Sequence, residues 1–328
     1  MKAILSRLFD HEKLTKEEAK AVLLDISHAK FNHVQISAFT TVYNMRPITI
    51  PELEGFRDAL LELCVKIDLG TTDTLDIVGT GGDGKNTFNI STTSAMVIAG
   101  AGYKVTKHGS YGVSSAVGSS NVLMALGYEF TNDQDTLRRH LEEANLCFLH
   151  APLFHPAMKE VVPVRKDLKM KTFFNMLGPL VNPIQPKYQL FGTFSLELAR
   201  MYQYLMQNSG RKFSIIYALD GYDEISLTGD FIARTNTKER LYSPEDLGQK
   251  AIDPATLYGG ETAEEAAEII LNILQDQAKP AQKATVISNA GMAIQVIHPE
   301  KSIEDCLAEA QESIESGAAY QGLQKILS

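Results

Sequence analysis

The sequence predicts an α/β protein in which a small all-helical domain precedes a larger α/β domain with a mainly parallel central sheet. Two observations lead to this prediction. Residues 1–66 carry only helical signals, whereas short apolar segments alternate with helical ones after residue 72. Strands that alternate with helices are typical of βαβ units, whose strands pair in parallel. A chain of 328 residues, 44% of them hydrophobic, can form one large domain or two of ordinary size.

The N-terminal helices are predicted from their capping signals and apolar spacing. LTKEEAKAVLLDISHA and TIPELEGFRDALLELCV each contain a Thr followed three residues later by a Glu, which is the spacing of a capping box. Apolar residues in the first of these segments recur at the three- and four-residue steps of one helical face. NHVQISAFTTVYNMR is expected to form a helix between them, and ILSRLF a short first helix.

The larger domain is predicted as strands joined by helices. The expected strands are TLDIVGT, YKVTKHG, LCFLHAP, YQLFGTF and KFSIIYAL, and the helices include SAMVIAGAG, NVLMALG, TLRRHLEEAN and LELARMYQYLMQ. EISLTG, FIARTN and ERLYS predict a short antiparallel excursion. Three helices are expected to close the chain, around 261–277, 281–297 and 302–316. The mostly helical segment 155–180 interrupts the alternation, so the expected domains are 1–66, joined by about 160–185, and 72–328.

The charge balance argues against two classes of partner. Forty acidic residues against 31 Lys and Arg give a formal net charge of −9. Nucleic acids and anionic membranes bind basic surfaces, so neither is an expected partner. The sequence shows no signal peptide and no apolar run of membrane-spanning length. Three widely spaced cysteines without a CxxC motif are typical of reduced thiols, and a cytoplasmic protein is expected.

The segment LDIVGTGGDGKNTFNISTTSAMVIAGAG, residues 75–102, places four glycines between a predicted strand and a predicted helix. Glycine lets a backbone approach a ligand closely, and free N–H groups at a helix N-terminus suit a phosphate. The segment matches neither GxGxxG nor GxxxxGK[ST], so the nucleotide-binding fingerprints do not apply. Asp83 in the loop would repel a phosphate unless a divalent cation or a sugar hydroxyl lay between them. Ser91, Thr92 and Thr93 are candidates to cap the helix, contact phosphate or ligate magnesium.

Two further stretches supply charge near this loop. Lys107 and His108 end the predicted strand YKVTKHG, and ligands of parallel sheets collect at such strand ends. Lys107 is the local cation that an anionic ligand would need in an acidic chain. Asp223 and Glu224 are adjacent in LDGYDEISLTG, and paired carboxylates beside phosphates suggest Mg²⁺. His108 and His155 are candidate general bases, although a lone His is more often structural.

The sequence resembles the anthranilate phosphoribosyltransferase family over essentially its whole length. Each motif alone is weak, but all eight occur in the family's order. They are GTGGD at 79–83, NIST at 89–92, KHG at 107–109, GSSNVLMALG at 118–127, HAPLFHPAMKEVVPVR at 150–165, FFNMLGPLVNP at 173–183, DGYDEISL at 220–227 and SNAGMAI at 288–294.

The resemblance implies a helical domain, built from the N-terminus and a later insertion, beside a larger α/β domain. It also implies a homodimer formed largely by the helical domains. The implied reaction is the second step of tryptophan biosynthesis from chorismate. Phosphoribose moves from phosphoribosyl pyrophosphate (PRPP) to the amine of anthranilate, with two Mg²⁺ ions per monomer.

The resemblance also implies a role for individual residues, carried over by position. The catalytic residues implied are Lys107 and Asp83. The residues implied to hold PRPP are Gly79, Gly82, Asp83, Thr87, Asn89, Ser91, Thr92, Lys107 and Ser119. The residues implied to contact Mg²⁺ are Ser91, Asp223 and Glu224. The residues implied to line the anthranilate site are Gly79, His108, Ser110, Ala151, His155, Arg165 and Gly178, with Arg165 pairing the carboxylate.

The chain departs from the family pattern at a few positions. The family usually shows KHGN followed by Arg, where this chain has Ser110 and Tyr111. That Asn normally helps to hold anthranilate, so the change falls in the acceptor site. Asn121 stands where Asp is usual and Lys171 where Arg is common. These changes leave the PRPP half of the pattern intact.

Two other functions are weighed against this one. A pyrimidine nucleoside phosphorylase-like enzyme would share the architecture and a glycine-rich anion loop, but it would bind inorganic phosphate and a nucleoside. The combination of Asp83, Ser91, Asp223 and Glu224 argues for pyrophosphate with magnesium instead. A non-catalytic relative that binds nucleic acid is disfavoured by the net negative charge and the intact GTGGD motif.

Overall fold

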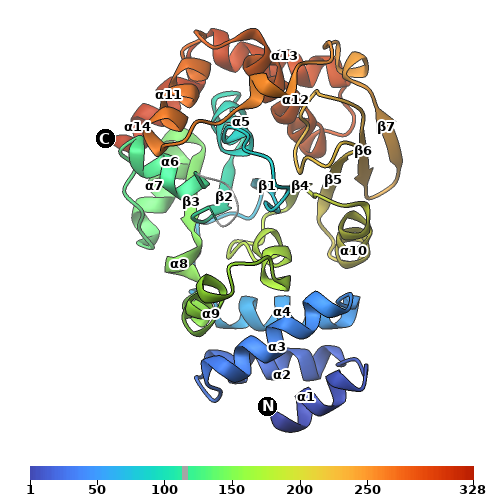
Figure 1. Cartoon of the computed structure of the whole chain (residues 1–328). Coiled ribbons are helices and arrows are strands. Elements are labelled where there is room, and N and C mark those ends of the chain that lie inside the picture. The colour runs from blue at the N-terminus through green and yellow to red at the C-terminus, as the bar shows by residue number, and fades with distance from the viewer. Residues whose placement is uncertain (113–116) are drawn as a thin grey trace. The chain divides into compact units, whose positions relative to one another are not determined.

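The computed structural model describes residues 1–112 and 117–328, which form two compact units. The helical unit comprises Met1–Lys66 and Ala151–Pro183, and the α/β unit comprises Ile67–His150 and Ile184–Ser328 (Figure 1). The helical unit is therefore built from two separate segments of the chain.

The helical unit begins with the four helices that the sequence predicts. They are α1 (Lys2–Phe9), α2 (Lys16–Ser27), α3 (His33–Met45) and α4 (Ile50–Leu63). The capping boxes predicted for α2 and α4 are both present. The second segment adds short elements, namely α8 (Ala151–Phe154), η1 (Pro156–Glu160), α9 (Val161–Leu168), η2 (Phe173–Met176) and η3 (Gly178–Leu180).

An aromatic cluster joins the two segments of the helical unit. Phe173 of the second segment stacks on Phe56 of α4 with 4.6 Å between ring centroids. Its ring also lies edge-on to Tyr43 and Phe39 of α3, at 4.9 Å and 6.2 Å. Phe39, Phe56 and Phe173 are almost fully buried. Burial of such rings contributes strongly to stability, which explains why a distant segment returns to this unit.

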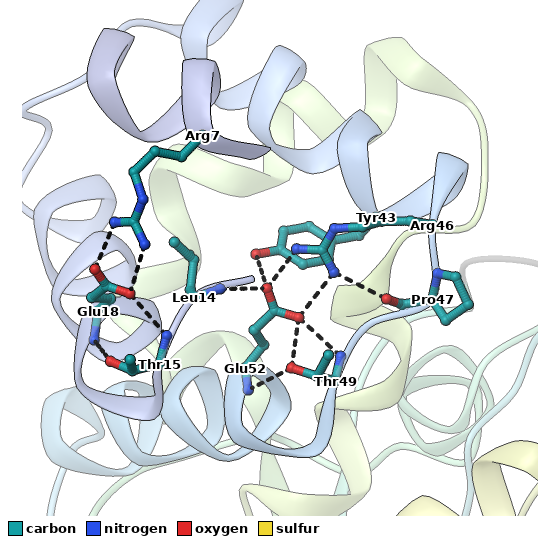
Figure 2. Close-up of polar contacts among 9 residues, drawn as sticks. All are labelled: Arg7, Leu14, Thr15, Glu18, Tyr43, Arg46, Pro47, Thr49 and Glu52. Atoms are coloured by element: carbon teal, nitrogen blue, oxygen red, sulfur yellow. Dashed lines mark hydrogen bonds and ion pairs between the residues drawn. The ribbon is translucent and has the colours of Figure 1, made fainter. Parts of the chain in front are cut away.

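A buried carboxylate lies in the middle of the helical unit. Glu52 is fully inaccessible and accepts hydrogen bonds from Arg46, Thr49, Tyr43 and the backbone N–H of Leu14 (Figure 2). Its capping-box role at the start of α4 thus extends to α3 and to the α1–α2 connection. A buried charge is tolerated only when it is paired and hydrogen-bonded, as Glu52 is.

In its described residues the α/β unit contains one seven-stranded sheet in the order β3-β2-β1-β4-β5-β6-β7. The first five strands in that order are parallel, which confirms the mainly parallel sheet, and β6 and β7 are antiparallel. The strands are β1 (Leu75–Gly79), β2 (Val105–Gly109), β3 (Leu146–His150), β4 (Tyr188–Gly192), β5 (Lys212–Ala218), β6 (Phe231–Thr235) and β7 (Glu239–Tyr242).

Helices connect and cover the strands (Figure 1). α5 packs against α12, α13 and α14 as well as against β1 and β2. The α-helices of this unit are α5 (Ile90–Gly100), α6 (Ser119–Ala125), α7 (Gln134–Ala144), α10 (Leu196–Met206), α11 (Ala263–Leu274), α12 (Pro280–Ile297), α13 (Ile303–Glu315) and α14 (Ala318–Leu327). Two 3₁₀ turns, η4 (Pro244–Leu247) and η5 (Pro254–Leu257), lie between β7 and α11.

Two predictions for this unit are wrong. EISLTG is not a strand, because Leu227 has a left-handed φ of +61° and the Ile225 backbone bonds to the side chain of Asn289 instead of to a strand. Four helices close the chain instead of three. Gly317, with φ of +75°, separates α13 from α14, a helix that the sequence pattern did not indicate.

The parallel register brings strand ends together. Gly79 at the end of β1 pairs with Gly192 at the end of β4, and Gly109 of β2 pairs with His150 of β3. The carboxyl ends of these parallel strands therefore share one edge of the sheet, where open α/β sheets bind ligands.

Candidate active site

The glycine loop, defined as residues 79–89, leaves β1 with three left-handed residues. Gly81, Gly82 and Gly84 have φ values of +67°, +80° and +77°, which side chains other than glycine rarely adopt. The loop leads into α5, whose N-cap Asn89 makes no side-chain cap hydrogen bond. Ser91 is therefore not the cap of the helix but lies in its first turn.

An acidic segment, residues 222–225, lies directly against the glycine loop. Oδ2 of Asp223 accepts a hydrogen bond of 2.5 Å from the N–H of Gly81, and Oε1 of Glu224 accepts one of 2.9 Å from the N–H of Ser91. A Cβ added at Gly79 would lie 2.5 Å from Oδ2 of Asp223, and one added at Gly192 would lie 1.5 Å from its main-chain oxygen. Glycine is required at Gly192, where the close atom belongs to the main chain, whereas a side chain at Gly79 would force the Asp223 carboxylate to move.

Asn289 of α12 fixes the acidic segment from its other side. Its Nδ2 donates to the main-chain oxygen of Ile225 at 2.8 Å, and its Oδ1 accepts from the Ile225 N–H at 3.1 Å. Asn289 is buried, and this reciprocal pair satisfies both polar groups of the Ile225 backbone. Asn289 therefore holds the residue next to Glu224 in place.

Lys107 of β2 is a buried cation at the same place. Only 2% of its surface is exposed, and its Nζ donates to the main-chain oxygen of Ile77 at 2.6 Å and to Oγ of Ser91 at 3.3 Å. Burial lowers the pKa of Lys107, while the negative charges of Asp76, Glu224 and Asp223 act in the opposite direction. Lys107 thus lies within the electrostatic influence of the acidic segment.

Burial and neighbouring negative charge raise the pKa values of two carboxylates in the acidic segment. Burial, and next the charge of Asp83, raise the pKa of Asp223 to about 7. Burial, and next the charge of Asp223, raise the pKa of Glu224 well above its usual value. Like charges that are held close together in a poorly solvated place favour either a proton or a bound cation. The site therefore has a deficit of positive charge that a metal ion would offset.

The distal part of the glycine loop is supported by residues 257–260. The N–H of Phe88 donates to the Leu257 oxygen at 2.8 Å, and the N–H of Gly259 donates to the Asn86 oxygen at 3.0 Å. Thr87 pairs with Tyr258 in an isolated antiparallel bridge. The loop therefore has a fixed course in the structure.

The predicted residues after β2 lie near one another. Oγ of Ser119 donates to the Ser110 oxygen at 3.1 Å, and a Cβ added at Gly109 would lie 2.5 Å from that Oγ. Nδ2 of Asn89 donates to the Val117 oxygen at 3.2 Å, which connects the glycine loop to the start of α6. Thr92, by contrast, is only 1% exposed.

Four residues predicted for the acceptor belong to the helical unit. They are Ala151, His155, Arg165 and Gly178. His155 is buried, with Nε2 2.9 Å from the Val181 oxygen, and burial lowers its pKa to about 4. An uncharged, buried imidazole of this kind is a structural group rather than a general base poised for neutral pH.

Arg165 differs from the other arginines of the helical unit. It is half-buried, and it forms no ion pair with any residue in the described part of the chain. Its Nη2 donates to Oδ1 of Asn175 at 3.3 Å, and its buried Nε has no partner among the described residues. Burial lowers its pKa. Arg165 is therefore a cation without a counter-ion among the described residues.

A ready-made metal cage and a membrane span are both absent from the described part of the chain. Residues 1–112 and 117–328 contain no group of three or more His, Cys, Asp and Glu side chains arranged to hold a metal. Within the same ranges no helix is long and apolar enough to cross a membrane.

Three residues near the site were not predicted from the sequence. Asp76 is a fully buried carboxylate that accepts from the His108 N–H at 3.3 Å and acts on Lys107. Gly192 and Asn289 position the acidic segment. Asn289 gives a recognisable signal, because it is a polar residue within the apolar motif SNAGMAI.

Comparison with known proteins decides the family. The model of the glycosyl transferase family a/b domain matches residues 71–320, and that of the glycosyl transferase family helical bundle domain matches residues 2–64. An anthranilate phosphoribosyltransferase of Cytophaga hutchinsonii is 55% identical over 325 residues, covering 99% of each chain. One of Bacteroides thetaiotaomicron is 52% identical over 327 residues, covering 100% of this chain and 98% of its own.

The chain belongs to the anthranilate phosphoribosyltransferase family.

Solved structures of this family agree in fold. The enzyme from Thermus thermophilus superposes with a TM-score of 0.91 at 31% identity and covers 98% of both chains. The enzyme from Saccharomyces cerevisiae, solved in complex with PRPP and Mg, also has a TM-score of 0.91 at 26% identity. It covers 98% of this chain and 95% of its own.

Proposed function

We propose that this chain transfers the phosphoribosyl group of PRPP to the amine of anthranilate, giving N-(5-phosphoribosyl)anthranilate and pyrophosphate in the presence of Mg²⁺. One observation carries the proposal. The acidic segment is hydrogen-bonded to both the glycine loop and the first turn of α5, through Asp223 and Glu224. Backbone donors, paired carboxylates and a buried Lys107 thus meet at one sheet edge, as a metal-bound diphosphate requires.

The donor set fits Mg²⁺. This ion is usually held by one or two protein carboxylates, with waters and substrate phosphates completing its shell, rather than by an all-protein cage. Asp223 and Glu224 supply such carboxylates. Burial first, and the charge of a neighbouring carboxylate next, raise their pKa values, and a bound cation would oppose both effects. Ser91 adds a hydroxyl beside them. We propose two Mg²⁺ ions per monomer, a stoichiometry that calorimetric titration would establish.

The PRPP half of the site is assigned to the α/β unit. The glycine loop is assigned to the diphosphate by its position in the family motif, and Lys107 adds positive charge where this loop meets α5. The remaining assignments follow position in the family motifs. They are Thr87, Asn89, Ser91, Thr92 and Ser119.

Arg165 is assigned to the carboxylate of anthranilate. Its guanidinium is half-buried without an ion-pair partner among the described residues, and burial lowers its pKa. A bound carboxylate would remove this imbalance, and Arg binds carboxylates in a bidentate manner. Gly79, His108, Ser110, Ala151, His155 and Gly178 are assigned to the same acceptor.

Charge stabilisation and positioning carry the proposed reaction. As pyrophosphate leaves C1 of the ribose, negative charge collects on the departing oxygens, and the ammonium of Lys107 would stabilise it. Mg²⁺ held by Asp223 and Glu224 would neutralise part of the same charge. The aniline nitrogen is neutral at pH 7, so it needs orientation more than a strong base, and Arg165 provides that orientation. The proton lost from the nitrogen passes to pyrophosphate.

A fluorescence assay of anthranilate consumption tests the function. The purified protein should consume anthranilate only when PRPP and Mg²⁺ are both present, and omission of either should stop the reaction. A parallel reaction with a pyrimidine nucleoside and inorganic phosphate should release no free base. Nucleoside cleavage without anthranilate consumption would contradict the proposal.

A homodimer through the helical unit is also proposed. A hollow of about 650 Å³ lies between α1, α3 and α9, and its lining is mostly apolar but includes His33, Ser37, Thr41 and Asp167. Phe9, Val34 and Met45 at this hollow are 61%, 78% and 86% exposed. Exposed apolar clusters of this kind mark association surfaces, and a second copy of the chain would cover them.

Light scattering after gel filtration tests the dimer. The wild-type protein should have twice the monomer mass, and Val34→Glu should shift it to the monomer. Lys13→Glu, an exposed charge change outside the hollow, should leave the dimer intact. A wild-type monomer at micromolar concentration would contradict the assignment.

We place the enzyme in the cytoplasm, where its three buried free cysteines would stay reduced.

A further inference from the structure

Lys85 of the glycine loop lies over the ring of Tyr222 in the acidic segment. Its Nζ is 4.5 Å from the ring centroid, a distance at which an ammonium is attracted to the face of an aromatic ring. Lys85 follows Asp83 by two positions, and Tyr222 immediately precedes Asp223. The contact therefore joins the two segments that we assign to PRPP and Mg²⁺, at a point that none of the assigned residues occupies.

The two partners differ in how firmly they are held. Tyr222 is 6% exposed and belongs to the hydrophobic core of the α/β unit, so its ring is a fixed platform. The N–H of Lys85 donates to Oδ1 of Asp83 at 3.0 Å, which folds the loop back on itself. The Lys85 side chain is half-buried and forms no ion pair within the described ranges. Its ammonium is thus held by the ring rather than by a carboxylate.

The negative charge around the glycine loop suggests a role for the Lys85 ammonium. Asp83, Asp223 and Glu224 place three carboxylates around the glycine loop, and Lys107 is the buried cation among them. A diphosphate adds further negative charge. Lys85 supplies a second cation, and the Tyr222 ring keeps that cation near the loop without an ion pair that would neutralise it.

We propose that Lys85 and Tyr222 form a positioning pair that fixes the glycine loop against the acidic segment and holds a cation for the diphosphate of metal-bound PRPP. The pair is specific to the donor substrate and does not take part in bond breaking. This inference rests on the proposed function, because it assigns the two residues to the PRPP half of that site.

The test measures PRPP affinity in the presence of Mg²⁺ by isothermal titration calorimetry. Lys85→Met keeps the side-chain stem and removes the charge, whereas Lys85→Arg keeps a cation. Tyr222→Leu removes the ring, whereas Tyr222→Phe keeps it. The contribution of such a contact corresponds to roughly a threefold to tenfold change in Kd for Lys85→Met and for Tyr222→Leu. The two conservative variants should stay within about twofold of wild type.

Two further readouts separate positioning from general damage to the fold. The KM for anthranilate should stay unchanged in every variant, while the KM for PRPP follows the Kd. The double variant Lys85→Met/Tyr222→Leu should bind PRPP about as weakly as Lys85→Met alone, because both changes break one contact. If Tyr222→Leu fails to fold, the PRPP affinities of Lys85→Met and Lys85→Arg still test the role of the cation. The PRPP affinity of Tyr222→Phe still tests whether the hydroxyl of Tyr222 contributes.

Three results would overturn the proposal. In the first, Lys85→Met binds PRPP as tightly as wild type. In the second, the Kd of the double variant rises by the product of the two single-variant factors. In the third, the KM for anthranilate and the KM for PRPP rise together. In each case the wild type would still bind PRPP, so the proposed function would stand. A wild type that does not bind PRPP would overturn the proposed function as well.

Discussion

The backbone N–H of Ser91 donates a hydrogen bond of 2.9 Å to Oε1 of Glu224, a residue 133 positions further along the chain. This bond ties the first turn of α5 to the acidic segment. It brings the helix N-terminus, the glycine loop and a carboxylate pair to one place. The proposed chemistry depends on the close approach of these three features more than on any single side chain.

The carboxylate pair is expected to be essential for turnover but not for folding. Asp223→Asn with Glu224→Gln should lower kcat/KM at least about 100-fold, because both proposed metal ligands lose their charge. The metal-free variant should unfold at the same temperature as wild type or higher, since burial and mutual repulsion already penalise both charges. Enzyme assays and thermal unfolding in EDTA measure the two effects.

A matched control for this variant is Asp220→Asn, which changes an exposed carboxylate in the same turn. It should keep near-normal activity. Near-normal activity in the double variant itself would refute the metal role of the pair.

Arg165 is expected to act on the acceptor alone. Arg165→Ala should raise the KM for anthranilate about tenfold or more, which corresponds to about 1.4 kcal/mol, and leave the KM for PRPP within about twofold. Lys166→Ala, an exposed neighbour on α9, is the control and should change neither value. Steady-state kinetics with each substrate varied in turn measures both constants. Equal shifts, or a shift for PRPP only, would count against the assignment.

Glu52 is expected to dominate the stability of the helical unit. Glu52→Gln should lower the free energy of unfolding by about 2–4 kcal/mol, because it leaves the largely buried Arg46 without a counter-charge. The exposed pair between Arg7 and Glu12 provides the control, and Glu12→Gln should cost less than about 1 kcal/mol. Urea unfolding monitored by circular dichroism gives both values. Similar losses in the two variants would contradict this role for Glu52.

Glu52 is also expected to make part of the protein's stability sensitive to acid. Burial by itself raises the pKa of Glu52, but the hydrogen bonds from Arg46, Thr49 and Leu14 outweigh it, and the pKa is lowered. Its stabilising contribution is therefore present above the unfolded-state pKa of about 4.3 and is lost as pH falls through the lower folded-state value.

On acidification, the loss of stability due to His155 is expected to begin at a higher pH than the loss due to Glu52. Its pKa is lowered to about 4 in the folded protein, chiefly by burial, against about 6.5 in the unfolded chain. The unfolded state therefore binds the proton first, and stability should fall as pH drops from about 6.5 towards 4. Between pH 7 and pH 5 the loss should be about 2 kcal/mol.

Urea unfolding at pH 7 and pH 5 measures this dependence. His155→Gln should remove most of the difference between the two pH values, whereas His28→Gln, at an exposed position, should leave it unchanged. A His155→Gln protein that loses as much stability as wild type on acidification would show that another group is responsible.

Local signals in the sequence predict local structure well in this protein. Thr15 with Glu18 and Thr49 with Glu52 have the spacing of capping boxes, and both boxes form. The glycine loop is recognisable because left-handed residues such as Gly82 require glycine. Lys107 is found because a polar residue at the end of a buried parallel strand stands out from the pattern.

Contacts between distant segments could not be predicted in the same way. The bond between Ser91 and Glu224 and the clamp of Asn289 on Ile225 depend on how strands and helices pack, which no local pattern encodes. The same clamp explains the wrong strand prediction for EISLTG. The segment is apolar enough for a strand, but its backbone groups are satisfied by a side chain instead of a neighbouring strand.

The account depends on the claim that the glycine loop and the acidic segment together bind metal-bound diphosphate. Isothermal titration calorimetry of PRPP into the purified protein tests this claim most directly. With Mg²⁺ present, saturable binding of one PRPP per chain is expected, and EDTA should abolish or strongly weaken it. Absence of PRPP binding in the presence of Mg²⁺, or equal binding in EDTA, would contradict the account.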